Sequence, residues 1–218
     1  MTKIKKIDLK INKTFGPHIG YCNLPEELIK DFNNDCNSII KDKDKVKRHD
    51  HSDSLVGNVK QELLITPQVF SKYMKLFNDL VWAYFDYHKN SHGFGKLRYD
   101  SAWYVRQYAG DFNPLHVHTN CHVSVIGYLK QPDGMIKEWE KEDRDHYPSA
   151  GYTEFHYGEA AMFNVNTVRV KPEVGLFYIF PSWMAHMVYP FRSEGERRTF
   201  SFNVLAVKTP KKDAPEPR

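Results

Sequence analysis

The stretch GLFYIFPSWMAHMVYPFRSEGERRTFSFNVL, residues 175–205, carries the pattern that decides the fold class. Its first part, Gly175 to Phe180, is a short apolar run typical of a buried strand, and Pro181 is expected to end it. From Arg197 onward, polar and aromatic residues alternate with the two-residue period of a second strand. No helical period separates the two runs. The stretch therefore predicts consecutive strands rather than strands joined by helices.

Similar short segments recur from about residue 98 onward. They are rich in β-branched and aromatic residues and are bounded by Gly, Pro and Asn, as strands usually are. These segments are 97–108, 122–129, 152–158, 166–172, 175–181 and 197–207. Many short strands without intervening helices indicate a sandwich or jelly roll rather than a parallel sheet. We therefore predict a mainly β core.

Two helices are predicted before these strands. The first covers residues 24–40 and begins near Pro25; the second covers 66–88, with Thr66 as N-cap and Pro67 in its first turn. Apolar residues recur at helical spacing in both, which predicts that each helix packs on a sheet. The stripes consist of Leu28, Phe32, Cys36 and Ile39 in the first helix, and Phe70, Tyr73, Phe77, Leu80 and Tyr84 in the second.

The charge pattern suggests how the chain is organised. Residues 41–54, KDKDKVKRHDHSDS, are nearly free of apolar side chains and are predicted to form a solvated loop. We therefore expect an N-terminal segment, 1–97, with two supporting helices and this charged loop. A β core over 98–207 and a disordered tail over 208–218 complete the predicted organisation.

Composition narrows the classes of function. The net charge of +4, from 31 basic and 27 acidic residues, gives no argument for nucleic-acid binding. No run approaches the roughly 18 apolar residues of a membrane span, and the N-terminus lacks the apolar centre of a signal peptide. The cysteines, Cys22, Cys36 and Cys121, show no CxxC spacing. These features predict a cytoplasmic protein; they give no oligomeric state.

The stretch NPLHVHTNCHVSVIGYL, residues 113–129, gathers histidines at the start of a predicted strand. His116 and His118 face the same way if the backbone is extended there, and two imidazoles at this spacing can bind one metal ion. On the same parity, His122, Ser124, Ile126 and Tyr128 share that face. A further histidine, His186, stands alone among apolar residues, where a packed core role is the commoner one.

The strand that begins at Arg197 places a charge inside an apolar sheet. Its alternation puts Arg197, Thr199, Ser201 and Asn203 on one face, and Arg198, Phe200 and Phe202 on the other. An unpaired buried charge is costly, so Arg197 needs a partner. A carboxylate ligand suits it, because a guanidinium offers two parallel donors. We expect truncation of Arg198, on the opposite face, to have little effect on ligand binding.

These motifs together resemble the iron(II)- and 2-oxoglutarate-dependent oxygenases, most closely the prolyl-hydroxylase-like branch found in bacteria and phages. The resemblance rests on H-x-H, a strand ending in Tyr-Leu, FPSWMAH and R-x-T-x-S-x-N, and it covers residues 98–207. It implies a double-stranded β-helix, a cupin-like jelly roll, supported by N-terminal helices. It also implies iron(II) as cofactor, 2-oxoglutarate as co-substrate, and hydroxylation of a C–H bond in a peptidyl, prolyl-like group or a small molecule.

The resemblance assigns roles to individual residues. His116 matches the first metal ligand, and His186 matches the distal histidine. Arg197 matches the residue that binds the far carboxylate of 2-oxoglutarate, with Thr199 and Tyr128 beside it. Ser201, on the same strand face, completes the predicted co-substrate site.

His118 departs from the family pattern, because the usual third ligand is Asp or Glu. A three-histidine site is the interpretation we favour. Asp111 is an alternative third ligand, and a changed metal or lost activity is a third possibility. A cupin-like metal-binding or catalytically silent jelly-roll module is the competing function. His122 is left open between a role around the metal and simple packing.

Overall fold

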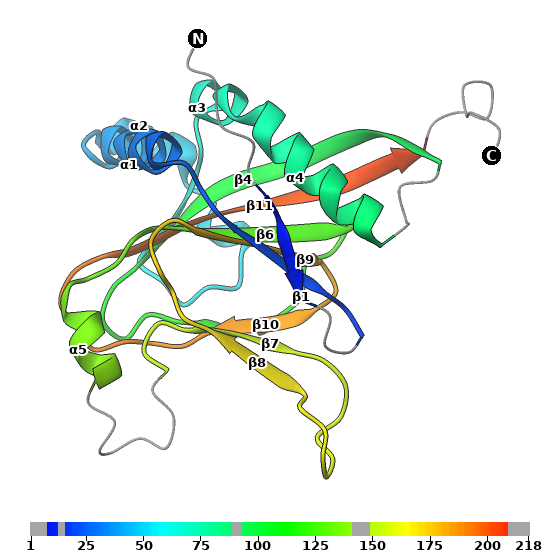
Figure 1. The fold of residues 1–218 in the computed structure, drawn as a ribbon. Coiled ribbons are helices and arrows are strands. Elements are labelled where there is room, and N and C mark those ends of the chain that lie inside the picture. Colours follow the sequence, from blue (N-terminus) through cyan, green and yellow to red (C-terminus); the bar gives the residue numbers. More distant parts are fainter. Residues whose placement is uncertain (1–7, 13–15, 89–92, 141–148, 209–218) are drawn as a thin grey trace.

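The computed structural model describes residues 8–12, 16–88, 93–140 and 149–208. Two antiparallel sheets lie one above the other, and helices from the N-terminal part of the chain gather on the outer side of the larger sheet (Figure 1). This is a jelly-roll arrangement, so the predicted mainly β fold with N-terminal helices is confirmed.

The larger sheet has seven strands in the order β1-β2-β9-β6-β11-β4-β3. Their bounds are β1 Lys10–Asn12, β2 Ile19–Asn23, β3 Gln61–Leu64, β4 Phe94–Gln107, β6 Val123–Lys130, β9 Leu176–Pro181 and β11 Arg197–Lys208. β11 lies at the centre between β4 and β6, so it is hydrogen-bonded on both sides. Its inward side chains are therefore held by two neighbouring strands.

The smaller sheet has four strands in the order β5-β10-β7-β8. Their bounds are β5 Asn113–His116, β7 Thr153–His156, β8 Thr167–Val170 and β10 Ala185–Val188. Each strand has only four residues. The sheet brings segments about seventy residues apart in the sequence, β5 and β10, side by side.

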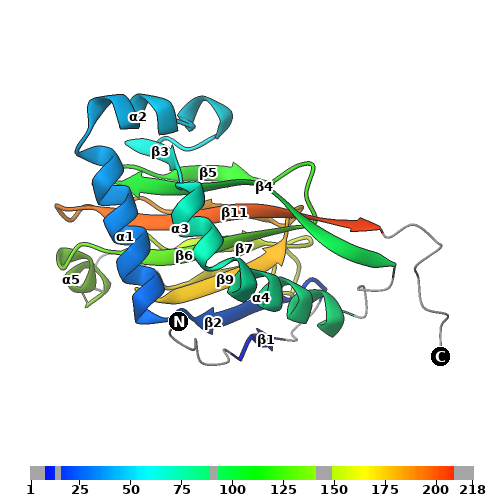
Figure 2. The same ribbon diagram turned by 90° about the horizontal axis from the view of Figure 1, so that it is seen from above.

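Helices α1 and α4 cross the strands of the larger sheet on its outer face (Figure 2). The helix bounds are α1 Glu26–Ile40, α2 Lys43–His49, α3 Pro67–Lys72, α4 Met74–Tyr87, α5 Gly134–Glu140 and the short 3-10 helix η1 Ser52–Ser54. Phe32 of α1 packs on Phe200 of β11, and Phe77 of α4 packs on both Phe200 and Phe202, with ring centroids 4.8–6.0 Å apart. Both predicted apolar stripes are buried. None of the described helices is long and apolar enough to cross a membrane.

Two predictions about the helical segment are wrong. The single helix expected over 66–88 is two helices, because the backbone leaves helical geometry at Tyr73, with φ −106° and ψ 7°. Thr66 does lie at the N-cap, but its hydroxyl donates to Asp35 instead of capping the helix. The charged segment 41–54 is not a plain loop. The Asp42 carboxylate accepts hydrogen bonds from the Asp44 and Lys45 amides and so starts α2 without any burial.

Several strands lie outside the predicted segments. β1, β2 and β3 precede residue 98 and join the edges of the larger sheet. β5, Asn113–His116, also lies outside the predicted strand segments. The proposed domain boundary at residue 97 stays a prediction. The predicted tail, apart from Lys208, lies outside the described residues.

Candidate metal and co-substrate site

Strand pairing in the smaller sheet brings the histidines together. His116 of β5 lies directly opposite His186 of β10, and their ring centroids are 4.3 Å apart. His118 follows β5, where its amide donates to the carbonyl of Ser182, and its Nε2 lies 3.3 Å from Nε2 of His186. One ligand atom from each ring lies within 4.8 Å of the others. The three histidines can therefore face one ion.

Backbone carbonyls fix which ring nitrogen of two histidines is free. Nδ1 of His116 donates to the Pro114 carbonyl at 2.7 Å, and Nδ1 of His186 donates to the Met184 carbonyl at 2.9 Å. Both protons then stay on Nδ1, which leaves Nε2 as a lone-pair donor toward the cluster. Nδ1 of His118 lies 3.4 Å from the Asn203 amide, which can donate or accept there depending on its orientation.

Burial keeps all three rings neutral. It lowers the pKa of His118 to about 4 and that of His186 to about 3, and nearby His116 adds to both shifts. Burial also lowers the pKa of His116. Neutral imidazole is the form that binds a metal, so no proton has to leave at neutral pH. The donor set fits iron(II), with imidazole in place of the usual carboxylate.

A cavity of about 530 Å³ extends from the histidines between the two sheets. Arg197, Thr199, Ser201 and Asn203 line it, as the predicted strand alternation requires. Phe200 and Phe202 point the other way, into the core under the helices. The faces predicted for these β11 side chains are therefore correct.

Arg197 is a buried cation with part of its hydrogen-bonding capacity unused. Its side chain is 1% exposed, and Nη1 donates to Oε1 of Gln107 on the neighbouring strand β4. Nε and Nη2 have no acceptor among the described residues. Burial lowers the pKa of Arg197, which reflects the cost of holding this charge away from water. A carboxylate ligand supplies what the site lacks, so these residues also fit 2-oxoglutarate.

The other predicted co-substrate residues differ in position. Thr199 is buried and lines the cavity with the half-buried Ser201. Tyr128 is not among the described cavity-lining residues. Its ring centroid lies 5.3 Å from Cζ of Arg197, and its hydroxyl shares a 2.7 Å hydrogen bond with Thr153. Tyr128 is therefore placed to support the guanidinium from the side.

His122 and Asp111 do not join this site. β6 begins at Val123, so the predicted parity fails at His122, whose ring packs on Phe85 and Phe94 and accepts from the Ala206 amide. Oδ2 of Asp111 accepts hydrogen bonds from the amides of Lys60 and Tyr108. Asp111 is not in the described histidine cluster, and this geometry favours the three-histidine interpretation.

Sequence reasoning overlooked three polar residues of the cavity region. Gln107 pairs with Arg197, Asn113 accepts from Gln107, and Glu62 lines the cavity from β3. The alternation of segment 97–108 contained the signal for Gln107. Glu62 lies in a short segment without a strand pattern, so nothing in the sequence marked it.

Comparison with known proteins gives a family match over the β core. Residues 101–203 match the family described as "Putative 2OG-Fe(II) oxygenase". Among curated proteins, none matches this sequence.

Solved structures with similar folds share little sequence with this chain. A prolyl-4-hydroxylase from Pseudomonas putida has a TM-score of 0.59 at 15% identity, over 87% of this chain and 92% of that one. A Trichoplax adhaerens prolyl hydroxylase, solved with a hypoxia inducible factor peptide fragment, has a TM-score of 0.53 at 12% identity. The match covers 86% of this chain and 83% of that one. The non-heme alpha-ketoglutarate-dependent carbocyclase SnoK has a TM-score of 0.57 at 10% identity. The match covers 85% of this chain and 79% of that one.

The family match covers the strands that carry the histidines and Arg197, and the structural likeness supports the fold alone. The β core of this chain, residues 101–203, is therefore similar to the iron(II)- and 2-oxoglutarate-dependent oxygenases.

Proposed function

We propose that His116, His118 and His186 hold iron(II), and that Arg197 binds the far carboxylate of 2-oxoglutarate, in an oxygenase that hydroxylates a peptide or small-molecule substrate. The observation that carries this proposal is the buried guanidinium in the same cavity as the histidines, with two nitrogens that have no partner among the described residues. A structural metal site has no use for a carboxylate clamp of this kind. The feature therefore favours the oxygenase over a silent jelly-roll module.

In this proposal, different residues of the chain orient the metal ligands, bind the co-substrate and limit the access of water. Iron(II), when bound with the co-substrate, supplies oxygen activation coupled to decarboxylation of 2-oxoglutarate. The carbonyls of Pro114 and Met184 hold protons on Nδ1 and so orient two of the rings. Arg197 orients the co-substrate, while Phe180, Ile126 and Val188 provide apolar walls that limit water.

The substrate class is part of the proposal. A peptidyl substrate is suggested by similar folds among prolyl hydroxylases, and a small molecule by the carbocyclase. The three cysteines are unpaired, which supports action in the cytosol.

The proposed function is tested by adding iron(II) and then 2-oxoglutarate without oxygen. We expect a visible metal-to-ligand absorption band from the chelate. Admission of oxygen should then release succinate, and a panel of peptides and metabolites should reveal which compounds increase that release. Metal binding without any band or succinate would instead support a metal-binding module.

Replacement of Arg197 by alanine should weaken 2-oxoglutarate binding by about 1.5–3 kcal/mol, the usual worth of hydrogen bonds to charged groups. The variant should keep iron(II), because Arg197 belongs to β11 and not to the histidine cluster. Titration of the absorption band with 2-oxoglutarate gives the co-substrate affinity, and the height of the band at saturation shows whether iron(II) is kept. Arg192→Ala, at an exposed position, is the matched control. Equal affinities for the two variants would remove Arg197 from the co-substrate site.

Replacement of His118 by aspartate should retain iron(II), because a carboxylate at this position restores the commoner triad. His118→Ala should bind iron(II) much more weakly. Asp111→Ala should keep normal iron content, since its carboxylate is already engaged by two backbone amides. Iron content measured on the three variants side by side checks the assignment; loss of iron in Asp111→Ala alone would favour the carboxylate alternative.

A further inference from the structure

A second charged group is buried in the cavity wall. Glu62 lies on β3, the edge strand beside β4 (Figure 2), and its side chain is 2% exposed. It pairs with Val105 of β4, which in turn pairs with Thr199 of β11. Neighbouring strands are about 4.8 Å apart, so Glu62 lies roughly 10 Å from Thr199 across the cavity-facing side of the sheet.

Nothing in the described structure satisfies this carboxylate fully. Its Oε2 is buried without a hydrogen-bond partner among the described residues. Burial, and secondarily the charge of Asp50, raises the pKa of Glu62 to about 7. A residue kept only for packing would be apolar here, because an unpartnered buried carboxylate destabilises the fold. The position therefore suggests a ligand that supplies the missing donor.

The charges around the cavity indicate which donor fits. Glu62 and the exposed Asp100 both line it, and Arg197 is the single lysine or arginine among its described lining residues. Arg197 lies on the central strand β11 and Glu62 on the edge strand β3, so the two opposite charges are separated across the sheet. The side of the cavity near Glu62 is therefore suited to a cation.

We infer that Glu62 is a specificity-determining residue that binds a positively charged N–H donor of the substrate, a primary ammonium or a guanidinium. This inference rests on the proposed function, in which Arg197 is already engaged by 2-oxoglutarate. The co-substrate then neutralises the one strong cation of the described cavity wall, and the carboxylate of Glu62 is left to select the substrate. The cation can belong to a basic side chain of a peptide or to a free amine.

The test compares charged probes with neutral probes of similar shape. In the peptide arm, acetyl-Gly-Lys-Gly-amide is compared with its norleucine counterpart; in the free-amine arm, n-pentylamine is compared with 1-pentanol. Binding to the full chain is measured by ligand-observed NMR with 2-oxoglutarate and without oxygen. We expect the cation to bind at least about tenfold more tightly than its neutral counterpart in one arm or both. The arm that shows the preference identifies the source of the cation.

Variants tie the preference to the carboxylate. Glu62→Gln keeps the size of the side chain and removes its charge, so it should reduce the preference to about twofold or less without weakening the neutral probe. Glu62→Met should behave in the same way, and both variants should melt no lower than wild type, because an unpartnered charge is removed. Glu173→Gln, on a side chain that is 57% exposed, should keep the full preference.

Two results would overturn the inference: equal binding of cation and neutral probe to wild type in both arms, or a preference that survives in Glu62→Gln and Glu62→Met. Failure of the proposed function is seen separately. It appears as absence of the iron and 2-oxoglutarate absorption band, whereas the probe comparison needs no turnover.

Discussion

Replacement of His186 by alanine is expected to abolish iron(II) binding and, with it, the absorption band formed with 2-oxoglutarate. His186 is the most buried of the three histidines, and its free Nε2 faces both others. Replacing a residue that only supports a metal ligand typically costs 10–100-fold in metal affinity. Loss of a ligand itself should cost at least about 100-fold. His116→Ala should have the same effect, because it lies directly opposite on β5.

The matched control is His122→Ala. His122 immediately precedes β6, and its ring packs on Phe85 and Phe94 instead of joining the histidine cluster. This variant should keep iron(II) and the band. Iron content after anaerobic loading and desalting measures all three variants, and thermal melting verifies that each is folded. Normal iron content in both His186→Ala and His116→Ala would refute the ligand assignment.

Local periodicity made much of the fold predictable. The stripes of both N-terminal helices and the alternation of β11 depend on neighbours in the sequence, and burial follows them closely. The order of the strands depends on pairing between distant segments, such as β5 with β10, and no local pattern encodes it. α2 was missed because its cap is a single residue, Asp42, and it has no apolar stripe.

The site was predictable where spacing carries information. His116 and His118 share a short motif, and Arg197 stands out as a charge on a strand face. His186 is a lone histidine in a four-residue strand, so its role came from the resemblance to a family. His122 was placed on the wrong face because the strand begins one residue after it. Glu62 is buried only because β3 pairs with β4, which the sequence does not reveal.

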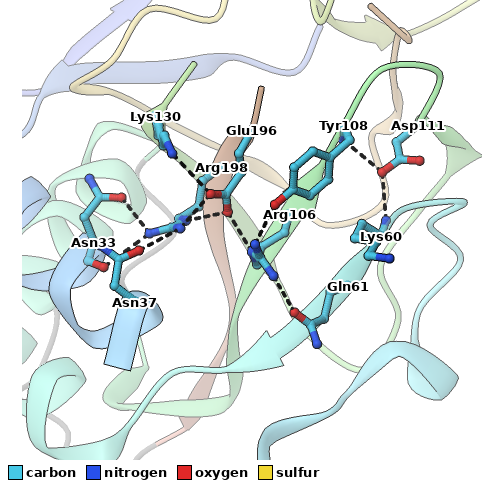
Figure 3. A network of polar contacts seen from close by, with 10 residues as sticks. All are labelled: Asn33, Asn37, Lys60, Gln61, Arg106, Tyr108, Asp111, Lys130, Glu196 and Arg198. Carbon is cyan, nitrogen blue, oxygen red and sulfur yellow. Dashed lines mark hydrogen bonds and ion pairs between the residues drawn. The ribbon is translucent and has the colours of Figure 1, made fainter. Parts of the chain in front are cut away.

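Replacement of Arg198 by alanine is expected to destabilise the fold by about 3–5 kcal/mol, the usual cost of breaking a buried ion pair. The prediction that Arg198→Ala has little effect on ligand binding stands beside this one, because Arg198 faces away from the cavity. Figure 3 shows why it matters: Arg198 binds both carboxylate oxygens of Glu196, at 2.9 and 2.8 Å, and donates to Asn33 and Asn37 of α1. The side chain is 1% exposed and joins helix α1 to the central strand.

Urea denaturation of Arg198→Ala and Arg197→Ala separates the two roles. Arg197→Ala should lose co-substrate binding with a smaller loss of stability, because it removes a charge that is only partly paired. Arg198→Lys should recover little, since an ammonium cannot bind Glu196 and both asparagines in the same geometry. If Arg198→Ala unfolds at the same urea concentration as wild type, the network of Figure 3 contributes nothing measurable.

Acid provides an independent check on this network. Burial acts to raise the pKa of Glu196, but hydrogen bonds from Arg198 and Arg106 outweigh it, so the pKa is lowered in the folded protein. A lowered carboxyl pKa contributes stability above the unfolded value, about 4.3 for Glu, and that contribution is lost as the pH falls through the folded value. Because Arg198 is the first of the groups that lower the pKa of Glu196, the wild-type protein loses more unfolding free energy in acid than Arg198→Ala does. The difference in unfolding free energy between the two should therefore be largest near neutral pH and should narrow below about pH 4.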